Sequence, residues 1–135
     1  MSSIKTIIAE NVQEHLERSD WMAAIAEMEK LFAIDRDPLI RVRIGDARLK
    51  LNRKCAAIRE YLRAAGLFEE KGFVVKALAQ YSLVLRLDAS NTYARNRMEV
   101  MEMLRPNRTA AKQQRVPMEY RVPQPFESTI PSQTS

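Results

Sequence analysis

The chain has little of the side-chain chemistry that most enzymes and metal proteins use. Its 135 residues include one cysteine, Cys55, and one histidine, His15, which supply no Cys–His pair, catalytic triad or metal-ligand cluster. Glycine is rare too, and Gly45 and Gly66 lie within helical patterns, not in a phosphate-binding loop after a strand. We therefore predict that the protein is not an enzyme and uses no cofactor, metal or small-molecule substrate.

Each of these scarce residues also has a simple structural interpretation. A single cysteine cannot form a disulfide within the chain, and Cys55 lies in an alanine-rich helical pattern. We expect it to be a small buried apolar residue. His15 is expected to be a half-buried helix residue.

Long apolar runs are missing as well. No window approaches the roughly 20 apolar residues needed to cross a bilayer. Residues 1–10 carry Lys5 and no long apolar run, so they do not resemble a secretory signal. The sequence predicts no membrane span and a cytoplasmic location.

The prolines mark a boundary in the chain, because five of the six follow Leu104. Residues 105–135 mix Pro, Gln, Ser, Thr and Arg with few apolar side chains, a composition typical of disordered segments. We predict a helical domain over residues 1–104 and a disordered basic tail over 105–135. An Arg-Val-Pro repeat at 115–117 and 121–123 is either chance repetition in a spacer or a linear motif for a partner or the protein's own groove.

The net charge of +5 is shared unequally between these two parts. Residues 105–135 hold five Lys/Arg and two Asp/Glu, which leaves seventeen bases against fifteen acids in residues 1–104. A nearly balanced helical body is typical of a solvated surface and not of a phosphate-binding face. Nucleic-acid binding is not expected of the body. Weak binding of nucleic acid or an anionic surface by the tail stays open as an alternative.

Apolar spacing and helix-capping residues predict an all-α fold of about six helices. Asp37-Pro38 is a helix start, and Asn52 and Gly72 are residues that accept the positive φ of a helix stop. The connections are short, so neighbouring helices should be antiparallel. The expected helices are Ile4–Arg18, a second from Ser19 or Asp20, a third from Pro38 to Asn52, Lys54–Lys71, Phe73–Leu87, and a sixth from Ser90 or Asn91 to Leu104.

The most specific pattern in the chain covers Ile58–Asn91. Its members are a turn glycine, a small residue, an aromatic residue and a Leu-x-Leu-Asp ending, namely Gly72, Ala77, Tyr81, and Leu85, Leu87 and Asp88. The pattern resembles the helix hairpin of the tetratricopeptide-repeat (TPR) family, whose repeat is about 34 residues long. Ala89 departs from the proline that usually follows in the family.

Two earlier copies of the pattern are visible but irregularly spaced. The first contains Trp21, Ala24, Ile25, Met28, Ile34 and Asp35, and the middle one contains Gly45, Ala57, Tyr61 and Ala64. The second step, from Ala57 to Ala77, is only 20 residues long, so the fourth helix would belong to two hairpins. The resemblance implies three irregular repeats stacked as a short right-handed solenoid.

Proteins of the TPR family bind an extended peptide or a helix in a groove, through exposed residues of the first helix of each hairpin. Carried over to this chain, the groove candidates are Arg43, Asp46, Arg59, Arg63, Asn96 and Arg97. Arg43, Arg63 and Arg97 occupy equivalent positions in their copies and could form a basic column that suits an acidic peptide, or they could simply be a solvated face. The Lys/Asn pattern of the carboxylate-clamp co-chaperones is absent. Met98, Met101 and Met103 provide a second candidate, an apolar contact surface on the sixth helix or a packed cap.

These features together predict a protein–protein interaction adaptor or scaffold whose partner is another protein, offering an acidic peptide or a helix. A small TPR chaperone of a bacterial secretion or motility apparatus is the closest alternative. Homodimerisation through the sixth helix is a further alternative role.

Overall fold

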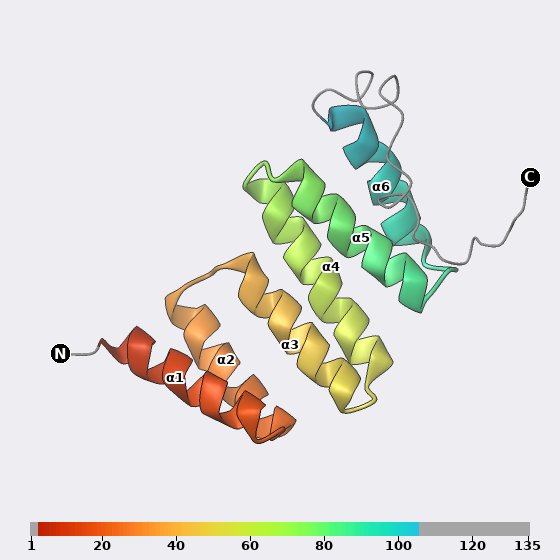
Figure 1. Ribbon diagram of the computed structural model, residues 1–135. Coiled ribbons are helices and arrows are strands. Elements are labelled where there is room, and N and C mark those ends of the chain that lie inside the picture. Colours follow the sequence, from red (N-terminus) through yellow and green to blue (C-terminus); the bar gives the residue numbers. More distant parts are fainter. Residues whose placement is uncertain (1–2, 106–135) are drawn as a thin grey trace, which may run out of the picture. The chain divides into compact units, whose positions relative to one another are not determined.

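A computed structural model of the chain describes residues 3–105, which are helical apart from short connections (Figure 1). The helices are α1 (Ile4–Glu17), α2 (Trp21–Ile34), α3 (Pro38–Lys50), α4 (Lys54–Glu70), α5 (Val74–Leu87) and α6 (Thr92–Leu104). No strand occurs among residues 3–105, so the all-α prediction is confirmed. Beyond Arg105, the predicted tail and its Arg-Val-Pro repeat lie outside the described residues. The chain divides into two units after Glu102, and the core and site below belong to residues 3–102.

Three of the helices, α2, α3 and α6, begin where the sequence offers a side-chain cap. The carboxylate of Asp20 accepts the amide hydrogen of Ala23, and that of Asp37 accepts the amide of Leu39. The amide oxygen of Asn91 accepts the amide of Ala94 in the same way. Each bond satisfies one of the free N–H groups at a helix start. The three predicted starts are confirmed, and Asp20 and Asn91 settle the two open choices.

Positive-φ residues end three of the helices. Asn52 has a φ of 63° and Gly72 a φ of 79°, as predicted for helix stops. Ser19, with a φ of 57°, does the same after α1 and was not predicted. Neighbouring helices from α1 to α5 pack against one another and run in alternating directions (Figure 1). The stacking of these hairpins as a right-handed solenoid stays a prediction.

The core consists of two clusters of buried side chains. One, the α2–α3 cluster, joins residues of α1, α2 and α3 around Met28, Phe32 and Ile44. The other, the α4–α5 cluster, surrounds Tyr61 and Tyr81, which are both fully buried, and includes Ala94 and Met101 of α6. Fully buried alanines at 57, 64, 65 and 77 allow the helices to approach closely.

Two expectations about burial are wrong. By their spacing, the apolar residues of α1 fall on one stripe that was expected to be buried, namely Ile4, Ile7, Ile8, Val12 and Leu16. Val12 is buried, but Ile4 is 69% exposed and Ile7 46%, because α1 packs mainly against α2 at one end of the row of helices. Cys55 is exposed and not buried. It lies in the first turn of α4, two residues before the buried stripe that starts at Ala57, so the neighbours of that stripe do not cover it. His15 is half-buried, as expected.

Two charged residues are buried between α2, α3 and α4. The guanidinium of Arg41, 3% exposed, lies 2.6 Å from a carboxylate oxygen of Glu29 and 3.0 Å from one of Glu60. It also lies over the ring of Phe32, 4.3 Å from the ring centroid. Arg48 adds a longer contact of 3.4 Å with Glu60. We call these five residues the Arg41 network, and because they come from three helices they fix α3 between its neighbours.

The ion pairs of Glu29 and Glu69 predict acid sensitivity. A hydrogen bond from Arg41 lowers the pKa of Glu29 below its ordinary value of 4.5. Burial raises the pKa of Glu69, but hydrogen bonds from Arg97 and Tyr81 outweigh it and lower the pKa overall. A carboxylate whose pKa is lower in the folded state contributes stability that is complete above its unfolded pKa and is lost as the pH falls through the folded value.

We therefore expect the urea midpoint of unfolding to be lower at pH 3 than at pH 6. In Arg97→Met the same decrease should be smaller, because Glu69 loses the partner that lowers its pKa. Circular dichroism at both pH values measures the two midpoints. A midpoint that does not change with pH in the unmodified protein would contradict this assignment.

Candidate functional site

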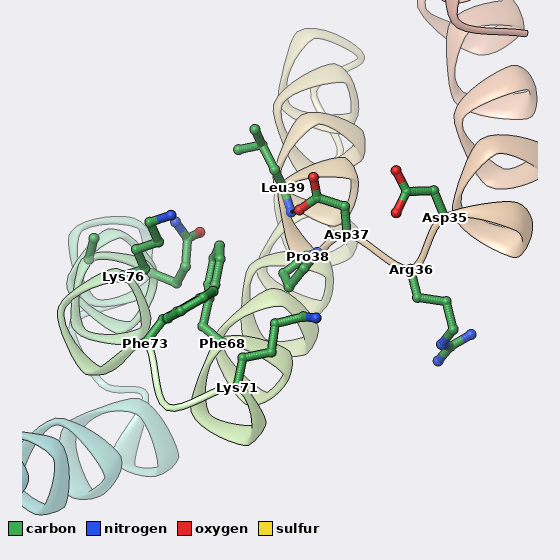
Figure 2. Close-up of a pocket in the computed structure, with 11 residues that line it drawn as sticks. Asp35, Arg36, Asp37, Pro38, Leu39, Phe68, Lys71, Phe73 and Lys76 are labelled. Atoms are coloured by element: carbon green, nitrogen blue, oxygen red, sulfur yellow. Dashed lines mark hydrogen bonds between the residues drawn. The ribbon is translucent and has the colours of Figure 1, made fainter. Parts of the chain in front are cut away.

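One hollow among the described residues has a volume of about 560 Å³. It lies between the α2–α3 connection and the start of α3 on one side, and the end of α4, the α4–α5 turn and α5 on the other (Figure 2). Its size falls within the range of ordinary binding pockets. We call it the main cavity, and it is lined by Asp35, Arg36, Asp37, Pro38, Leu39, Phe68, Lys71, Phe73, Lys76, Ala79 and Gln80.

The apolar part of the main cavity can be reached from solvent. Phe68 is buried beneath it, 5% exposed, whereas Phe73 is 47% exposed and Leu39 46%. The centroids of the two phenylalanine rings are 6.4 Å apart. Figure 2 shows the two rings close together, with Lys76 on one side and Lys71 on the other. The cavity therefore offers an aromatic surface with positive charges beside it.

The charges that line the main cavity are not balanced. Asp35 pairs with Lys5 at 2.9 Å, and Asp37 caps α3. Arg36, Lys71 and Lys76 have no carboxylate within 4.0 Å among residues 3–105. These three cations are therefore available to an outside anion.

Two smaller hollows, of about 190 and 180 Å³, follow the main cavity along α3 and are linked to it in series by shared lining residues. The first shares Asp35, Asp37 and Leu39 with it, and the second shares Arg43 with the first. Leu39, Arg43, Asp46 and Lys50 of α3 line this series at spacings of four, three and four residues, which places them on one face of the helix. We call the three hollows together the α3 groove. Eleven helical steps give the α3 part a length of about 16 Å.

Positive charge continues along this face. Arg43 and Lys50 have no carboxylate partner among residues 3–105, and the Lys50 ammonium lies 5.7 Å from the centroid of the Trp21 ring. Asp46 accepts the hydroxyl hydrogen of Tyr61 at 2.6 Å. Burial, together with this hydrogen bond, raises the pKa of Tyr61 above its ordinary value. The lining of the α3 groove thus holds five cations, Arg36, Arg43, Lys50, Lys71 and Lys76, against three carboxylates, Asp35, Asp37 and Asp46.

The structure places the six predicted groove residues in different surroundings. Arg43 and Asp46 line the α3 groove together. Arg59 and Asn96 are exposed on α4 and α6. Arg63 is exposed as well, with its guanidinium 5.8 Å from the Phe32 ring centroid.

Arg97 has an internal role. Its guanidinium lies 2.6 Å from Glu69, which also accepts the hydroxyl hydrogen of Tyr81, so this carboxylate joins α4, α5 and α6. Arg43, Arg63 and Arg97 therefore have different neighbours. The basic column that would unite them stays a prediction.

The methionines of α6 divide between the two expected roles, a packed cap and an apolar contact surface. Met101 is 3% exposed and belongs to the α4–α5 cluster, and Met98 packs partly buried against the same cluster. Met103 is 75% exposed. The wide apolar arc of α6 therefore serves largely to attach this helix to α4 and α5, which is why its methionines are not all at the surface.

Phe73 and the lysines beside it were not among the site residues expected from the sequence. Phe73 occupies the N-cap position of α5 and makes no side-chain capping bond. Serine, threonine, aspartate and asparagine are the residues favoured there. A large aromatic residue at an N-cap, flanked by Lys71 and Lys76, was the signal that could have revealed the main cavity.

Other kinds of site find no support in this part of the chain. Among residues 3–105, no three His, Cys, Asp or Glu side chains gather as a metal site requires. None of the helices described here has both the length and the apolar character needed to cross a bilayer. Neither a family model nor a curated protein matches the chain. The fold and the groove define an all-α protein with an open, positively charged groove.

Proposed function

We propose that the protein is an interaction adaptor that binds a segment of another protein along the α3 groove. The observation that carries the proposal is the exposed aromatic lining of the main cavity and its continuation along one face of α3. Exposed apolar surface of this kind commonly marks an interaction site. A groove about as long as three turns of helix suits a peptide or helix better than a compact small molecule.

The resemblance to the TPR family supports this proposal, because its helix hairpins bind partner segments in a groove. Under this proposal α3, the first helix of the middle copy, supplies the groove residues Arg43 and Asp46. A chaperone would hold its unfolded client in the same groove. The groove therefore does not distinguish the two roles, and the chaperone alternative stays a prediction. The cytoplasmic location also stays a prediction.

The test compares what the intact protein and its variants retain in affinity purification. Phe73→Ser removes the exposed ring from the cavity, while serine is a favourable N-cap residue that should preserve α5. We expect the amount of partner that this variant retains to fall by at least about tenfold, as is usual when a central aromatic contact is removed. Mass spectrometry identifies the partner, and circular dichroism checks that the variant is folded.

The matched control is Met22→Ser. Met22 is 57% exposed in the first turn of α2 and does not line the α3 groove. It should retain the same partner as the unmodified protein. Equal retention by Phe73→Ser and Met22→Ser would exclude the main cavity as the binding site.

A further inference from the structure

We propose that the α3 groove selects an acidic segment that carries one large apolar side chain. The apolar side chain occupies the main cavity beside Phe73, and carboxylates on either side of it pair with the surrounding cations. This inference rests on the proposed function and names the class of partner that the groove accepts. It differs from the basic column expected from the sequence, because the residues that carry it are Arg36, Lys71, Phe73 and Lys76.

The apolar anchor follows from the lining of the main cavity. Phe68, Phe73 and Pro38 form its apolar walls, and Ala79 leaves space beside them because its side chain is small. Phe73 is about half exposed, so a partner side chain placed against it would remove apolar surface from water. Ring-to-ring contact at 4.5–7 Å adds to this burial. Large aromatic and aliphatic side chains are therefore favoured in the cavity over polar ones.

The acidic residues on either side of the partner's apolar side chain are inferred from the surroundings of the cations that line the main cavity. The Lys76 ammonium lies 5.0 Å from the centroid of Phe73, and the Arg36 guanidinium lies 4.8 Å from that of Phe32. The aromatic faces position these two cations without neutralising them. Lys71, at the end of α4, is likewise without a carboxylate partner among residues 3–105. An incoming carboxylate can therefore pair with any of the three without breaking an ion pair inside the protein.

The rest of the α3 groove also favours a negatively charged partner. Arg43 and Lys50 extend the unpaired positive charge along α3, while Asp35 is balanced by Lys5. A basic segment would be repelled by these cations, and a neutral one would leave them without compensation. Complementary charge of this kind increases association rate and selectivity.

A single-stranded nucleic acid is a weaker fit to these observations. It would need a continuous track of cations for its phosphates. Here the cations alternate with Asp35, Asp37 and Asp46 along the lining, so they form no continuous track. An acidic peptide can place its carboxylates between these positions.

The first experiment selects 12-residue peptides from a random phage-displayed library on the full chain and, in parallel, on Phe73→Ser. We expect sequences that bind only the unmodified protein and contain one Phe, Trp, Leu or Met between Asp and Glu residues. Enriched peptides that require Phe73 but are neutral or basic would overturn the acidic class and leave the proposed function intact. No enrichment, or enrichment that is indifferent to Phe73→Ser, would overturn the proposed function itself.

The second experiment measures one selected peptide, labelled with fluorescein, by anisotropy. The double variant Lys71→Gln/Lys76→Gln should weaken binding by about tenfold and flatten its dependence on salt. The matched control, Lys54→Gln/Arg86→Gln, removes two exposed cations that do not line the α3 groove and should bind as the unmodified protein does. Equal weakening in both pairs would mean that only the overall charge matters, which overturns the selective role of the groove.

Two further probes distinguish other occupants of the groove. A 12-nucleotide single-stranded oligothymidylate that competes with the peptide at equal affinity would overturn the inference in favour of a nucleic acid. Sedimentation over a range of protein concentrations tests a second copy of the chain. A dimer that Phe73→Ser dissociates would overturn it in favour of self-association.

Discussion

Replacing Gly45 with alanine is expected to destabilise the protein by about 1–3 kcal/mol, the usual cost of overpacking a core. A Cβ atom at Gly45 would lie 2.7 Å from Cε1 of Tyr61, closer than real Cβ contacts come. Tyr61 cannot easily move, because it is fully buried and its hydroxyl is held by Asp46. For a domain of this size, each kcal/mol corresponds to about 4–8 °C in the thermal midpoint. Thermal unfolding followed by circular dichroism measures the change.

Gly66 provides the matched control within the protein. It also lies inside a helix, α4, but a Cβ atom there would have no neighbour within 4 Å. Gly66→Ala should therefore stabilise the protein by about 0.5–1 kcal/mol, the usual gain from replacing a helical glycine. If both alanine variants shift the midpoint in the same direction, close contact with Tyr61 is not the reason for glycine at position 45.

Replacing Arg41 with methionine is expected to cost about 3–5 kcal/mol, as is usual when one partner of a buried ion pair is removed. The change leaves the carboxylate of Glu60, 10% exposed as a side chain, with only the longer contact to Arg48. Methionine keeps much of the volume beside Phe32, so lost packing contributes little. Urea unfolding measures the difference in the free energy of unfolding.

A double variant separates the charge from the shape of the network. Arg41→Met/Glu60→Leu removes both buried charges and should recover most of the stability lost in Arg41→Met, because no unpaired charge remains. The control is Arg18→Met, which removes an exposed ion pair with Glu14 and should change stability by less than about 0.5 kcal/mol. Additive losses in the double variant would show that Arg41 and Glu60 do not act as a pair.

Both predictions bear on the groove as well as on stability. Gly45 lets α3 approach α4, and the Arg41 network joins α3 to α2 and α4. The walls of the main cavity come from the α2–α3 connection and from α4 and α5. A displacement of α3 would therefore widen or close the groove. Partially destabilised variants at Gly45 should bind partner segments more weakly even where they remain folded.

The sequence by itself determined where several of the helices begin and end. Asp37-Pro38, Asn52 and Gly72 mark their boundaries through local physics, namely a capping hydrogen bond, the fixed φ of proline and the tolerance of positive φ. The α-helical character of each segment follows from the spacing of its apolar residues, which repeats within a few residues. Gly45 and Ala77, the small residues of the TPR-like pattern, are both buried.

Only the tertiary structure decided which side chains are covered and which meet. The exposure of Ile4, Ile7 and Cys55 depends on which helices lie beside α1 and the start of α4. The burial of Arg41 and Glu60 depends on carboxylates and cations from three helices, and a single-helix pattern assigns such residues to the surface. The main cavity likewise combines residues from Asp35 to Gln80. Burial, pairing and cavities are properties of contacts between distant segments, whereas helix boundaries depend on neighbours in the chain.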